Sequence, residues 1–291
     1  MKELTVLSLF DGISGGQIAL ERAGYKVKKY YASEVDKYAI QITQKNYPNT
    51  IQLGDVTKWK EWDIDWKSID LLIGGSPCQD LTFAGKMKGL GGERSSLFYC
   101  YRDILNHIKE VNPNILFLLE NVKTKQDTLD IISNEVGVTP VRINSNLVSA
   151  QNRDRFYWTN INEGKIPQPN DKNLYLKDIV IDEMDNQFPL SKQHYDAFMK
   201  SYPNWKPCLL DNKSKPLLAT YYKQPPHCPY IPSKASESGY RRLTPIECEK
   251  LQTLPENYTE GVSTTQRYKS IGNGWTIDVI VHIFNQIEQS R

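Results

Sequence analysis

Short strand-like runs that each stop at a glycine or an acid recur along the first half of this 291-residue chain. Residues 4–10, 27–33 and 115–119 are such runs, and Ile69-Asp70-Leu71-Leu72-Ile73 is another. Their length and composition are typical of buried strands. Because helix-like stretches separate them, the pattern predicts an open α/β fold, whose chemistry lies at the carboxyl ends of its strands.

The first run leads into a glycine-rich turn, Asp11-Gly12-Ile13-Ser14-Gly15-Gly16, and then into a helix-like stretch from Gln17 to Ala23. Glycine at such a turn lets a nucleoside-bearing cofactor lie against the backbone at the amino end of a helix. Asp11 and Ser14 stand where the dinucleotide fingerprint requires other residues, so a nicotinamide cofactor is disfavoured.

Acids follow the next two strand-like runs. Glu34 comes directly after Val27–Ser33, roughly 20 residues beyond Gly12, where dinucleotide folds place a ribose-binding acid. Asp55 follows the short run of residues 51–54. Because parallel strands end at one crevice, we expect these carboxylates to converge on one cofactor. The alternative for each acid is a helix N-cap, which is a common role of aspartate.

The run that ends at Ile73 continues as Gly74-Gly75-Ser76-Pro77-Cys78-Gln79. The glycines permit close approach of a ligand and Pro77 fixes its own φ, which indicates a thiol presented on a stiff loop as a nucleophile. An ordinary buried cysteine is the alternative, because free cysteine is among the most buried residue types. The glycine- and lysine-containing segment Thr82–Glu93 is expected to close over a bound substrate.

Two further segments place polar groups beside strand-like runs. Glu120 ends the run that begins at Ile115 and is a candidate acid in the same crevice as Cys78, with a structural ion pair or a helix cap as the alternative. Gln151, Arg153 and Arg155 alternate, so on a strand they would face one way. Their amide and guanidinium groups suit a planar heterocycle, a carboxylate or a phosphate, whereas a solvated charge ladder is the alternative.

Composition limits the classes of protein that fit. The net charge of +2 is close to neutral, so binding of nucleic acid requires a local basic face. The five cysteines form no C-x-x-C pair, which argues against a zinc site or a disulfide framework and for a reducing compartment. No apolar stretch is long enough to span a bilayer, so we expect a soluble protein that is not exported.

The composition and periodicity of the sequence change after Ile161. Residues 162–240 are polar, rich in proline, tyrosine and lysine, and without a sustained apolar period, which predicts a small loop-rich domain. A linker or a degenerate domain is the alternative. Helical texture returns at Thr244-Pro245, where threonine is a typical cap and proline a typical first helical residue. The chain then ends in Gly272-Asn273-Gly274-Trp275 and an apolar helix over residues 276–289.

The chain resembles the DNA cytosine-5 methyltransferase family in an ordered series of motifs. These are Phe10-Asp11-Gly12 with its glycine turn, Glu34, Asp55, Pro77-Cys78-Gln79, Glu120-Asn121-Val122, Gln151-x-Arg153-x-Arg155 and Gly272-Asn273-Gly274. The resemblance spans residues 4–160 and 240–288 and is similar to the compact bacterial or phage type, with some details of the animal de novo subgroup.

This resemblance implies a Rossmann-like methyltransferase sheet and methyl transfer from S-adenosylmethionine to carbon 5 of a flipped-out cytosine in a specific DNA sequence, leaving S-adenosylhomocysteine and requiring no metal. Cys78 would attack carbon 6 of the ring, Glu120 would bind ring nitrogen 3, and Arg155 with Arg153 would hold the ring carbonyl. The implied cofactor-binding residues are Phe10, Asp11, Gly12, Ile13, Ser14, Gly15, Glu34, Val35, Asp55, Val56, Ser76, Pro77, Leu97, Asn273 and Trp275.

The resemblance also implies a division of the chain. Residues 1–161 would form the catalytic and cofactor-binding domain, 162–240 a small target-recognition domain, and 241–291 a return to the catalytic domain. Side chains suited to phosphate and base contacts around the recognition interval are Lys213, Lys215, Tyr221, Tyr222, Lys223, His227, Lys234, Arg241 and Arg242.

The partners implied are double-stranded DNA containing a target cytosine and, as a candidate, a cognate restriction endonuclease, with no membrane. The protein would act as a monomer in the cytoplasm of a bacterial or phage-infected cell. Three alternatives are a tRNA cytosine-5 methyltransferase of the same fold, a catalytically silent DNA-binding relative and, third, a nicotinamide oxidoreductase. Retention of Cys78, Glu120, Arg153 and Arg155 together argues against the silent relative.

Overall fold

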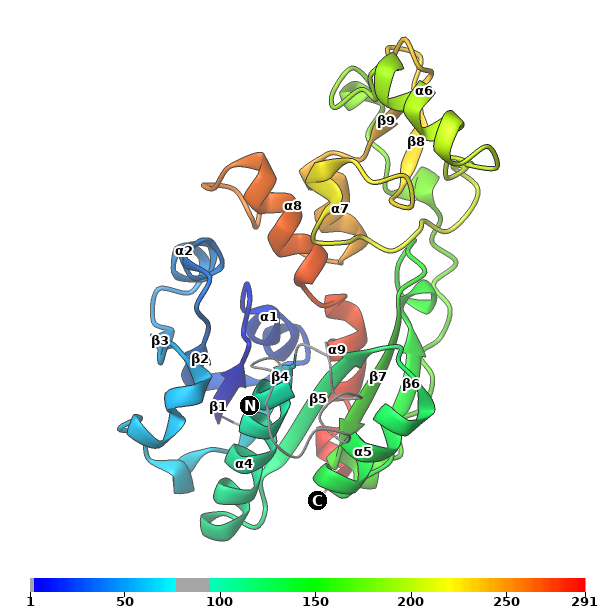
Figure 1. The fold of residues 1–291 in the computed structure, drawn as a ribbon. Coiled ribbons are helices and arrows are strands. Elements are labelled where there is room, and N and C mark those ends of the chain that lie inside the picture. Colours follow the sequence, from blue (N-terminus) through cyan, green and yellow to red (C-terminus); the bar gives the residue numbers. More distant parts are fainter. Residues whose placement is uncertain (1–2, 77–94, 291) are drawn as a thin grey trace. The chain divides into compact units, whose positions relative to one another are not determined.

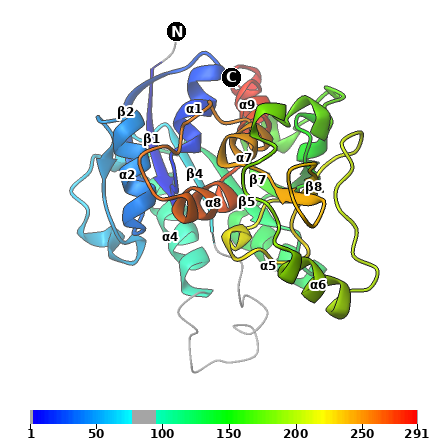
Figure 2. The ribbon, with the colours of Figure 1, turned by 90° about the horizontal axis from the view of Figure 1, so that it is seen from above.

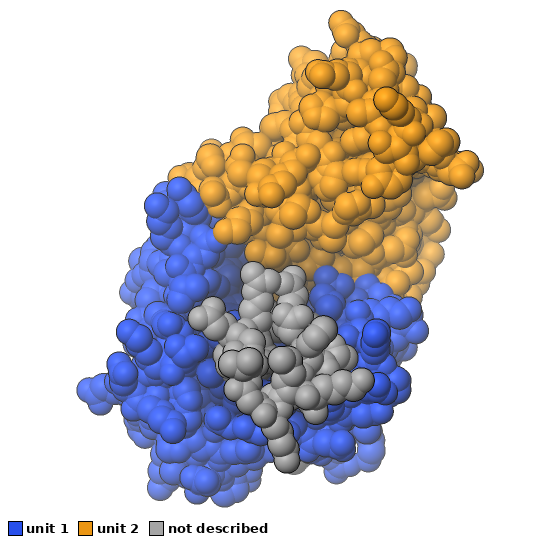
Figure 3. Space-filling model, viewed as in Figure 1, with its two compact units in different colours: residues 1–143, 154–168, 280–291 blue, residues 144–153, 169–279 orange. Residues whose placement is uncertain are grey.

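The computed structural model describes residues 3–76 and 95–290 of the chain (Figure 1). These residues divide into two compact units, shown in different colours in Figure 3. Unit 1 comprises residues 1–143, 154–168 and 280–291, and unit 2 comprises residues 144–153 and 169–279. Each unit therefore contains segments that are distant in the sequence.

A seven-stranded sheet forms the centre of unit 1, with the strand order β3-β2-β1-β4-β5-β7-β6 in the described residues. Figures 1 and 2 both show β1, β4, β5 and β7 following one another across it. The pairs along β3-β2-β1-β4-β5 are parallel, while β7 runs antiparallel to β5. The strands are β1 (Glu3–Leu9), β2 (Lys26–Ser33), β3 (Ile51–Gln52), β4 (Leu71–Gly75), β5 (Leu116–Val122), β6 (Val141–Asn144) and β7 (Asp154–Thr159).

The apolar runs of the sequence are these strands, and the expected Rossmann-like α/β sheet is confirmed. Helices and short 3-10 turns connect them. They are α1 (Gly15–Arg22), α2 (Lys37–Asn46), η1 (Val56–Glu61), η2 (Trp66–Ser68), α4 (Ser95–Val111), α5 (Gln126–Val136), η4 (Ile161–Gly164) and η8 (Ile287–Ser290).

Helices cover both faces of the sheet. Alternate residues of a strand point to opposite faces, so neighbouring residues show which helix packs on each face. Leu72 belongs to a core cluster with Tyr101 of α4 and Leu129 of α5. Its neighbour Ile73 faces the other way, toward α1, where a Cβ added to Gly16 would lie 2.3 Å from the Ile73 Cδ1 atom. Helices α4 and α5 thus pack on one face and α1 on the other.

Unit 2 is built mainly from turns and short elements, as the polar texture of residues 162–240 predicts. Its two-stranded antiparallel sheet pairs β8 (Tyr230–Pro232) with β9 (Tyr240–Arg242). The remaining elements are η3 (Ser145–Leu147), η5 (Leu176–Asp178), η6 (Asp182–Met184), α6 (Lys192–Ser201), η7 (Tyr221–Lys223), α7 (Pro245–Leu251) and α8 (Thr264–Asn273), while α9 (Ile277–Phe284) spans the boundary with unit 1.

Helix α7 begins where the sequence predicts it. Thr244 and Glu247 form a capping box, in which the threonine hydroxyl accepts from the Glu247 N–H and the glutamate accepts from the Thr244 N–H, with Pro245 as the first helical residue. No helix in the described ranges combines the length and the apolarity that crossing a membrane requires.

A buried ion pair ties β9 to α7. Arg241 and Glu247 are 1% and 0% exposed, and two guanidinium nitrogens of Arg241 donate to the two carboxylate oxygens of Glu247, each at 2.8 Å. Glu247 also accepts from the N–H of Ile181 at 2.9 Å. The expectation that Arg241 presents its side chain to DNA is therefore wrong, because its charge is paired inside unit 2.

Residues 241–279 lie in unit 2, whereas we expected them in the catalytic domain. Contacts of Tyr221 help to explain this difference. Tyr221 is buried in η7, accepts from the Leu243 N–H and packs 5.1 Å from the ring of Tyr268 in α8. The segments before and after residue 240 therefore share one core. Tyr221, like Arg241, is a core residue rather than the DNA contact that we expected.

We predict that Glu247→Gln destabilises the protein by about 3–5 kcal/mol, because the buried Arg241 charge loses its two-bond partner and keeps only the 3.4 Å contact with Asp185. Glu163→Gln is the control, since Glu163 pairs with Lys165 at 2.6 Å on the surface, where both side chains are more than three-quarters exposed. Urea unfolding should show a large loss for Glu247→Gln and no measurable loss for Glu163→Gln. Similar losses in the two variants would contradict the role given to the buried pair.

Candidate functional site

The turn after β1 has an unusual backbone. Phe10, Gly12 and Ser14 have φ angles of 56°, 59° and 56°, all in the left-handed region. Only glycine adopts this region without cost, so a turn with two non-glycine residues there must be held by its surroundings. Such strain is concentrated at ligand-binding sites, and here it immediately precedes α1.

The Asp11 carboxylate holds this turn together. It accepts a hydrogen bond from the Tyr30 hydroxyl of β2 at 2.8 Å and another from the Ser14 hydroxyl. Burial raises the pKa of Asp11, and the hydroxyl groups that donate to the carboxylate oppose that shift. Tyr30 was not among the expected site residues, because a tyrosine inside an apolar run carries no signal that distinguishes it from a core residue.

Glu34 connects the end of β2 to the same turn. One carboxylate oxygen accepts from the Gly12 N–H at 2.8 Å, and the other accepts from the N–H groups of Val35 and Asp36, also at 2.8 Å. Val35 is 71% exposed beside this carboxylate. An acid fixed by backbone donors next to an exposed apolar side chain can bind a ligand that has both hydroxyl groups and a flat apolar ring.

Asp55 caps a helical turn, which was the alternative considered for it. Its carboxylate accepts from the N–H and the hydroxyl of Thr57 at 2.9 and 2.8 Å at the start of η1. These bonds lower the pKa of Asp55, so the exposed group stays ionised. The next residue, Val56, is buried in the main core, and Ile13 in the turn after β1 is also buried. Both side chains are therefore packed inside the protein and support the backbone of the site.

The end of β4 leads toward the expected nucleophile. Ser76 is buried, and its hydroxyl has no hydrogen-bond partner among the described residues. A Cβ on Gly74 would lie 2.9 Å from the Leu9 carbonyl oxygen, so strand packing already requires glycine there. Pro77, Cys78 and the segment 82–93 lie outside the described residues. Leu97 of α4 is partly buried and packs against the main core.

Glu120 and Arg155 form a pair on neighbouring strands. Antiparallel pairing of β5 with β7 sets Val122 opposite Arg155, two residues beyond Glu120 on β5. The Arg155 Nε atom lies 2.8 Å from a Glu120 carboxylate oxygen, and the side chains are 15% and 12% exposed. The contact is ionic, without a well-directed hydrogen bond from Nε. The pair combines a carboxyl group and a guanidinium group, the functional groups expected to handle a planar polar ring.

Gln151 and Arg153 do not share a strand with Arg155, and that expectation is wrong. Strand β7 begins at Asp154, and both residues belong to unit 2. The Gln151 side chain is fully buried, and its carbonyl oxygen accepts from the Leu217 N–H at 2.7 Å. Gln151 therefore has a structural role within unit 2.

Arg153 is an anchor for the turn that follows α8. Its guanidinium group donates to the carbonyl oxygens of Leu217 at 2.9 Å, Gly272 at 3.1 Å and Gly274 at 3.0 Å, and the residue is only 5% exposed. A guanidinium group bound to three backbone carbonyls in its own unit supports the backbone around Asn273. The geometry gives no support to the direct ring contact that we expected of Arg153.

The expected DNA-reading side chains differ in their surroundings. Lys213 and Lys215 donate to the backbone carbonyls of Asn146 and Lys206. Arg242 lies over the rings of Phe188 and Tyr268, at 5.5 and 5.3 Å from their centroids. Lys223, His227 and Lys234 are exposed, while Tyr222, Trp275 and Arg242 are half-buried and Asn273 is exposed, all within unit 2.

Comparison with known proteins gives a consistent family. The sequence model described as C-5 cytosine-specific DNA methylase matches residues 4–289. The type II methyltransferase M1.ScrFI of Lactococcus lactis subsp. cremoris is 31% identical over 94% of this chain and 75% of its own length. M.SsoII of Shigella sonnei is also 31% identical, over 97% of this chain and 79% of its own length.

Among solved structures, the Entamoeba histolytica methyltransferase EhMeth superposes with a TM-score of 0.79 at 18% identity, covering 99% of both chains. The S. pombe Dnmt2 methyltransferase has a TM-score of 0.74 at 15% identity, over 99% of this chain and 98% of its own. At these identities the superpositions establish the fold.

We predict that Tyr30→Phe lowers stability by about 1.5–3 kcal/mol at pH values where Asp11 is ionised, because the carboxylate then loses a hydroxyl donor. Since the hydroxyl favours the ionised form, its removal raises the folded-state pKa of Asp11 further. The loss should be complete above that raised pKa and should disappear as the pH falls below the wild-type value, where Asp11 is protonated in both proteins.

Tyr47→Phe is the matched control, because its hydroxyl donates at 2.9 Å to Glu21 at the surface. Urea unfolding over a pH series measures both variants. Equal effects of the two substitutions, or an effect of Tyr30→Phe that does not depend on pH, would contradict the role given to the Asp11 carboxylate.

Proposed function

The chain belongs to the C-5 cytosine-specific DNA methylase family, and from this membership we propose how its residues carry out the reaction of a DNA (cytosine-5)-methyltransferase. The observation that carries the proposal is the Glu120–Arg155 pair, which adjoins β4, the strand that leads to Cys78. The substrate is DNA, and the methyl donor of the family is S-adenosylmethionine.

The residues at the ends of β1 and β2 fit that donor. Its ribose hydroxyls suit the Glu34 carboxylate, which the Gly12 N–H holds in place, and its adenine ring suits the exposed side chain of Val35. Asp55 supplies an ionised acceptor, and the Ser76 hydroxyl is a buried polar group that a ligand could satisfy. When bound, S-adenosylmethionine supplies the methyl group on its sulfonium. Phe10, Leu97, Asn273 and Trp275 remain proposed contacts from the resemblance.

Cys78 is the proposed nucleophile. Carbon 5 of cytosine is a weak nucleophile in an aromatic ring, and a bond from the thiolate sulfur to carbon 6 removes the aromaticity and makes carbon 5 part of an enamine. After carbon 5 gains the methyl group, a base removes its proton, the double bond re-forms, and the thiolate leaves. Ordered water is our proposal for that base.

Glu120 and Arg155 are proposed to stabilise the charge that this attack places on the ring. The Glu120 carboxyl group would donate a proton to ring nitrogen 3 and accept from the exocyclic amine. The guanidinium of Arg155 would bind the ring carbonyl oxygen, which is stabilisation of the oxyanion type. Arg153 acts as a positioning residue, through the backbone of residues 272–274.

The target cytosine must leave the duplex, because stacked neighbours cover both faces of the ring. We propose that unit 2 reads the DNA sequence through exposed cations, of which Lys223 and Lys234 are examples. The curated relatives are type II methyltransferases, which supports a cognate restriction endonuclease as a partner. Because Glu34, Glu120 and Arg155 come from one chain, we propose that the protein acts as a monomer. We also propose that it acts in the cytoplasm of a bacterial or phage-infected cell.

Bisulfite sequencing of DNA from cells that express the protein tests the function. We predict protection of cytosines within one short sequence and loss of that protection in Cys78→Ser, since the serine hydroxyl is a much weaker nucleophile than a thiolate. Cys248→Ser is the control, because Cys248 is buried in α7 and has no proposed role in the chemistry. Protection that persists in Cys78→Ser would contradict the assignment of Cys78 as the nucleophile. If bisulfite converted every cytosine in DNA from cells that express the wild type, the proposed function would be contradicted.

We predict that Glu120→Gln lowers the single-turnover rate of methyl transfer by roughly 10²- to 10⁴-fold at saturating DNA and cofactor, the range for a positioned acid. Glu135→Gln is the matched control, because Glu135 pairs with Arg102 at 2.6 Å elsewhere in unit 1. Its rate should remain close to that of the wild type. Equal rates for the wild type and Glu120→Gln in rapid-quench measurements would refute the proposal that Glu120 acts as the acid.

A further inference from the structure

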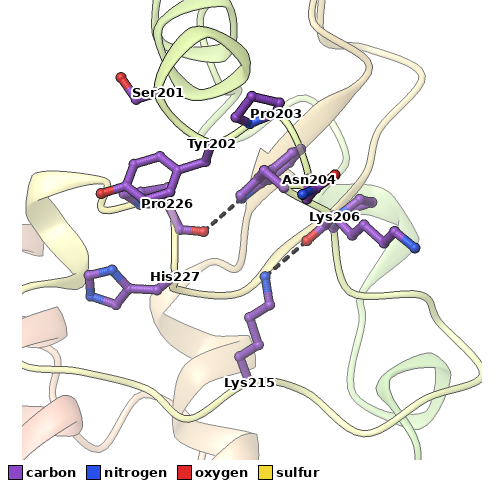
Figure 4. Close-up of a pocket in the computed structure, with 10 residues that line it drawn as sticks. Ser201, Tyr202, Pro203, Asn204, Lys206, Lys215, Pro226 and His227 are labelled. Carbon is purple, nitrogen blue, oxygen red and sulfur yellow. Dashed lines mark hydrogen bonds between the residues drawn. The ribbon is translucent and has the colours of Figure 1, made fainter.

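Unit 2 contains a cavity of about 650 Å³ beside the end of α6 (Figure 4). Figure 4 shows Tyr202, Pro226 and His227 along one side of it and Lys215 across from them. Trp205 and two more prolines complete the ring-bearing wall. None of the described residues that line the cavity is acidic, while Lys206 and Lys215 are cationic and His227 is exposed at its rim.

The wall of the cavity is held in place by contacts within unit 2. The Trp205 indole N–H donates to the Pro226 carbonyl oxygen at 2.6 Å, and its ring packs at 5.4–5.8 Å from the rings of Phe198, Tyr230 and Tyr240. Lys215 donates to the Lys206 carbonyl oxygen at 2.9 Å. These bonds fix the wall, so a ligand would meet ring faces and positive charge rather than the indole N–H.

Tyr202 presents an exposed aromatic ring to the cavity. Tyr202 directly follows α6 and is 55% exposed. Its backbone is fixed at both ends, because its N–H donates to the Phe198 carbonyl oxygen at 2.7 Å and its carbonyl oxygen accepts from the Trp205 N–H at 2.8 Å. Exposed aromatic rings next to cations are the means by which proteins bind unstacked bases, since every base has a flat π-face and an adjoining phosphate.

We propose that this cavity binds a nucleotide, with its base stacked on Tyr202 and its phosphate beside His227 and Lys215. The absence of acidic side chains among the described lining residues favours an anion over a neutral proline-rich peptide, which the aromatic and proline wall would otherwise suit. The source assigned to the nucleotide, an unpaired base of bound DNA, rests on the proposed function.

The nucleotide chemistry is tested with dAMP by saturation-transfer difference NMR, which detects weak ligands. The full-length protein is used with excess S-adenosylhomocysteine, which keeps dAMP out of the proposed cofactor site. The base protons should receive saturation from the wild type. Tyr202→Ala should weaken binding about 5- to 150-fold, the usual effect of removing a stacking ring, whereas Tyr202→Phe should bind as the wild type does. Rescue by phenylalanine separates stacking from a hydrogen bond of the hydroxyl.

Leu209→Ala is the matched control, because Leu209 is also 55% exposed in unit 2 and does not line the cavity. It should bind dAMP as the wild type does. Binding of dAMP that is unchanged in Tyr202→Ala would overturn the proposal. Binding of a polyproline peptide, with no response to dAMP, would also overturn it.

The source of the nucleotide is tested with two DNA duplexes, one fully paired and one with a single unpaired 2-aminopurine. We expect the unpaired duplex to bind more tightly, its fluorescence to change on binding, and both differences to vanish in Tyr202→Ala. If Tyr202→Ala affects dAMP but neither duplex, the assignment to DNA is overturned. These measurements need no methyl transfer, so a wild type that binds dAMP but methylates no DNA would refute only the proposed function.

Discussion

Strand register in the central sheet determines where each polar group of the site lies. Leu9 of β1 pairs with Ser33 of β2 and with Gly74 of β4, and Gly75 pairs with Glu120 of β5. The Phe10 turn, Glu34, Ser76 and Glu120 consequently follow one another along one edge of the sheet. A slip of one residue would turn the side chains of a strand to the opposite face, so the hydrophobic pattern that fixes the register also fixes the site.

Register alone does not hold these groups in place, and two carboxylates complete the arrangement. Asp11 binds the hydroxyl of Tyr30 in β2, and Glu34, just after β2, binds the N–H of Gly12, so each carboxylate ties the turn after β1 to β2 or to its end. The pairing of β7 with β5 has a similar effect, because it brings Arg155 to Glu120. A rigid scaffold of this kind positions reacting groups before the substrate arrives, which lowers the cost of reaching the transition state.

The strands, the glycine turn and the capped start of α7 could be predicted from the sequence, because each depends on local periodicity or on one residue's backbone preference. Arg153 and Arg241 could not. Both lie in segments that suggest exposed cations, yet Arg153 binds three backbone carbonyls and Arg241 binds Glu247. Only tertiary contacts decide whether a guanidinium group meets solvent or a buried acceptor. The partners of Arg153 are 64 to 121 residues away in the sequence. Glu247 is only six residues from Arg241, but it belongs to the capping box of α7, which by itself does not reveal a buried ion pair.

The central claim is that the chain methylates carbon 5 through a covalent bond between Cys78 and the cytosine ring. A duplex that contains 5-fluorocytosine at the target position tests it directly, because fluorine cannot leave carbon 5 as a proton does, and the enzyme remains attached. Denaturing electrophoresis should show a protein–DNA adduct that requires S-adenosylmethionine and is absent in Cys78→Ala. A wild type that methylates ordinary DNA but forms no adduct, or an adduct that persists in Cys78→Ala, would contradict this account.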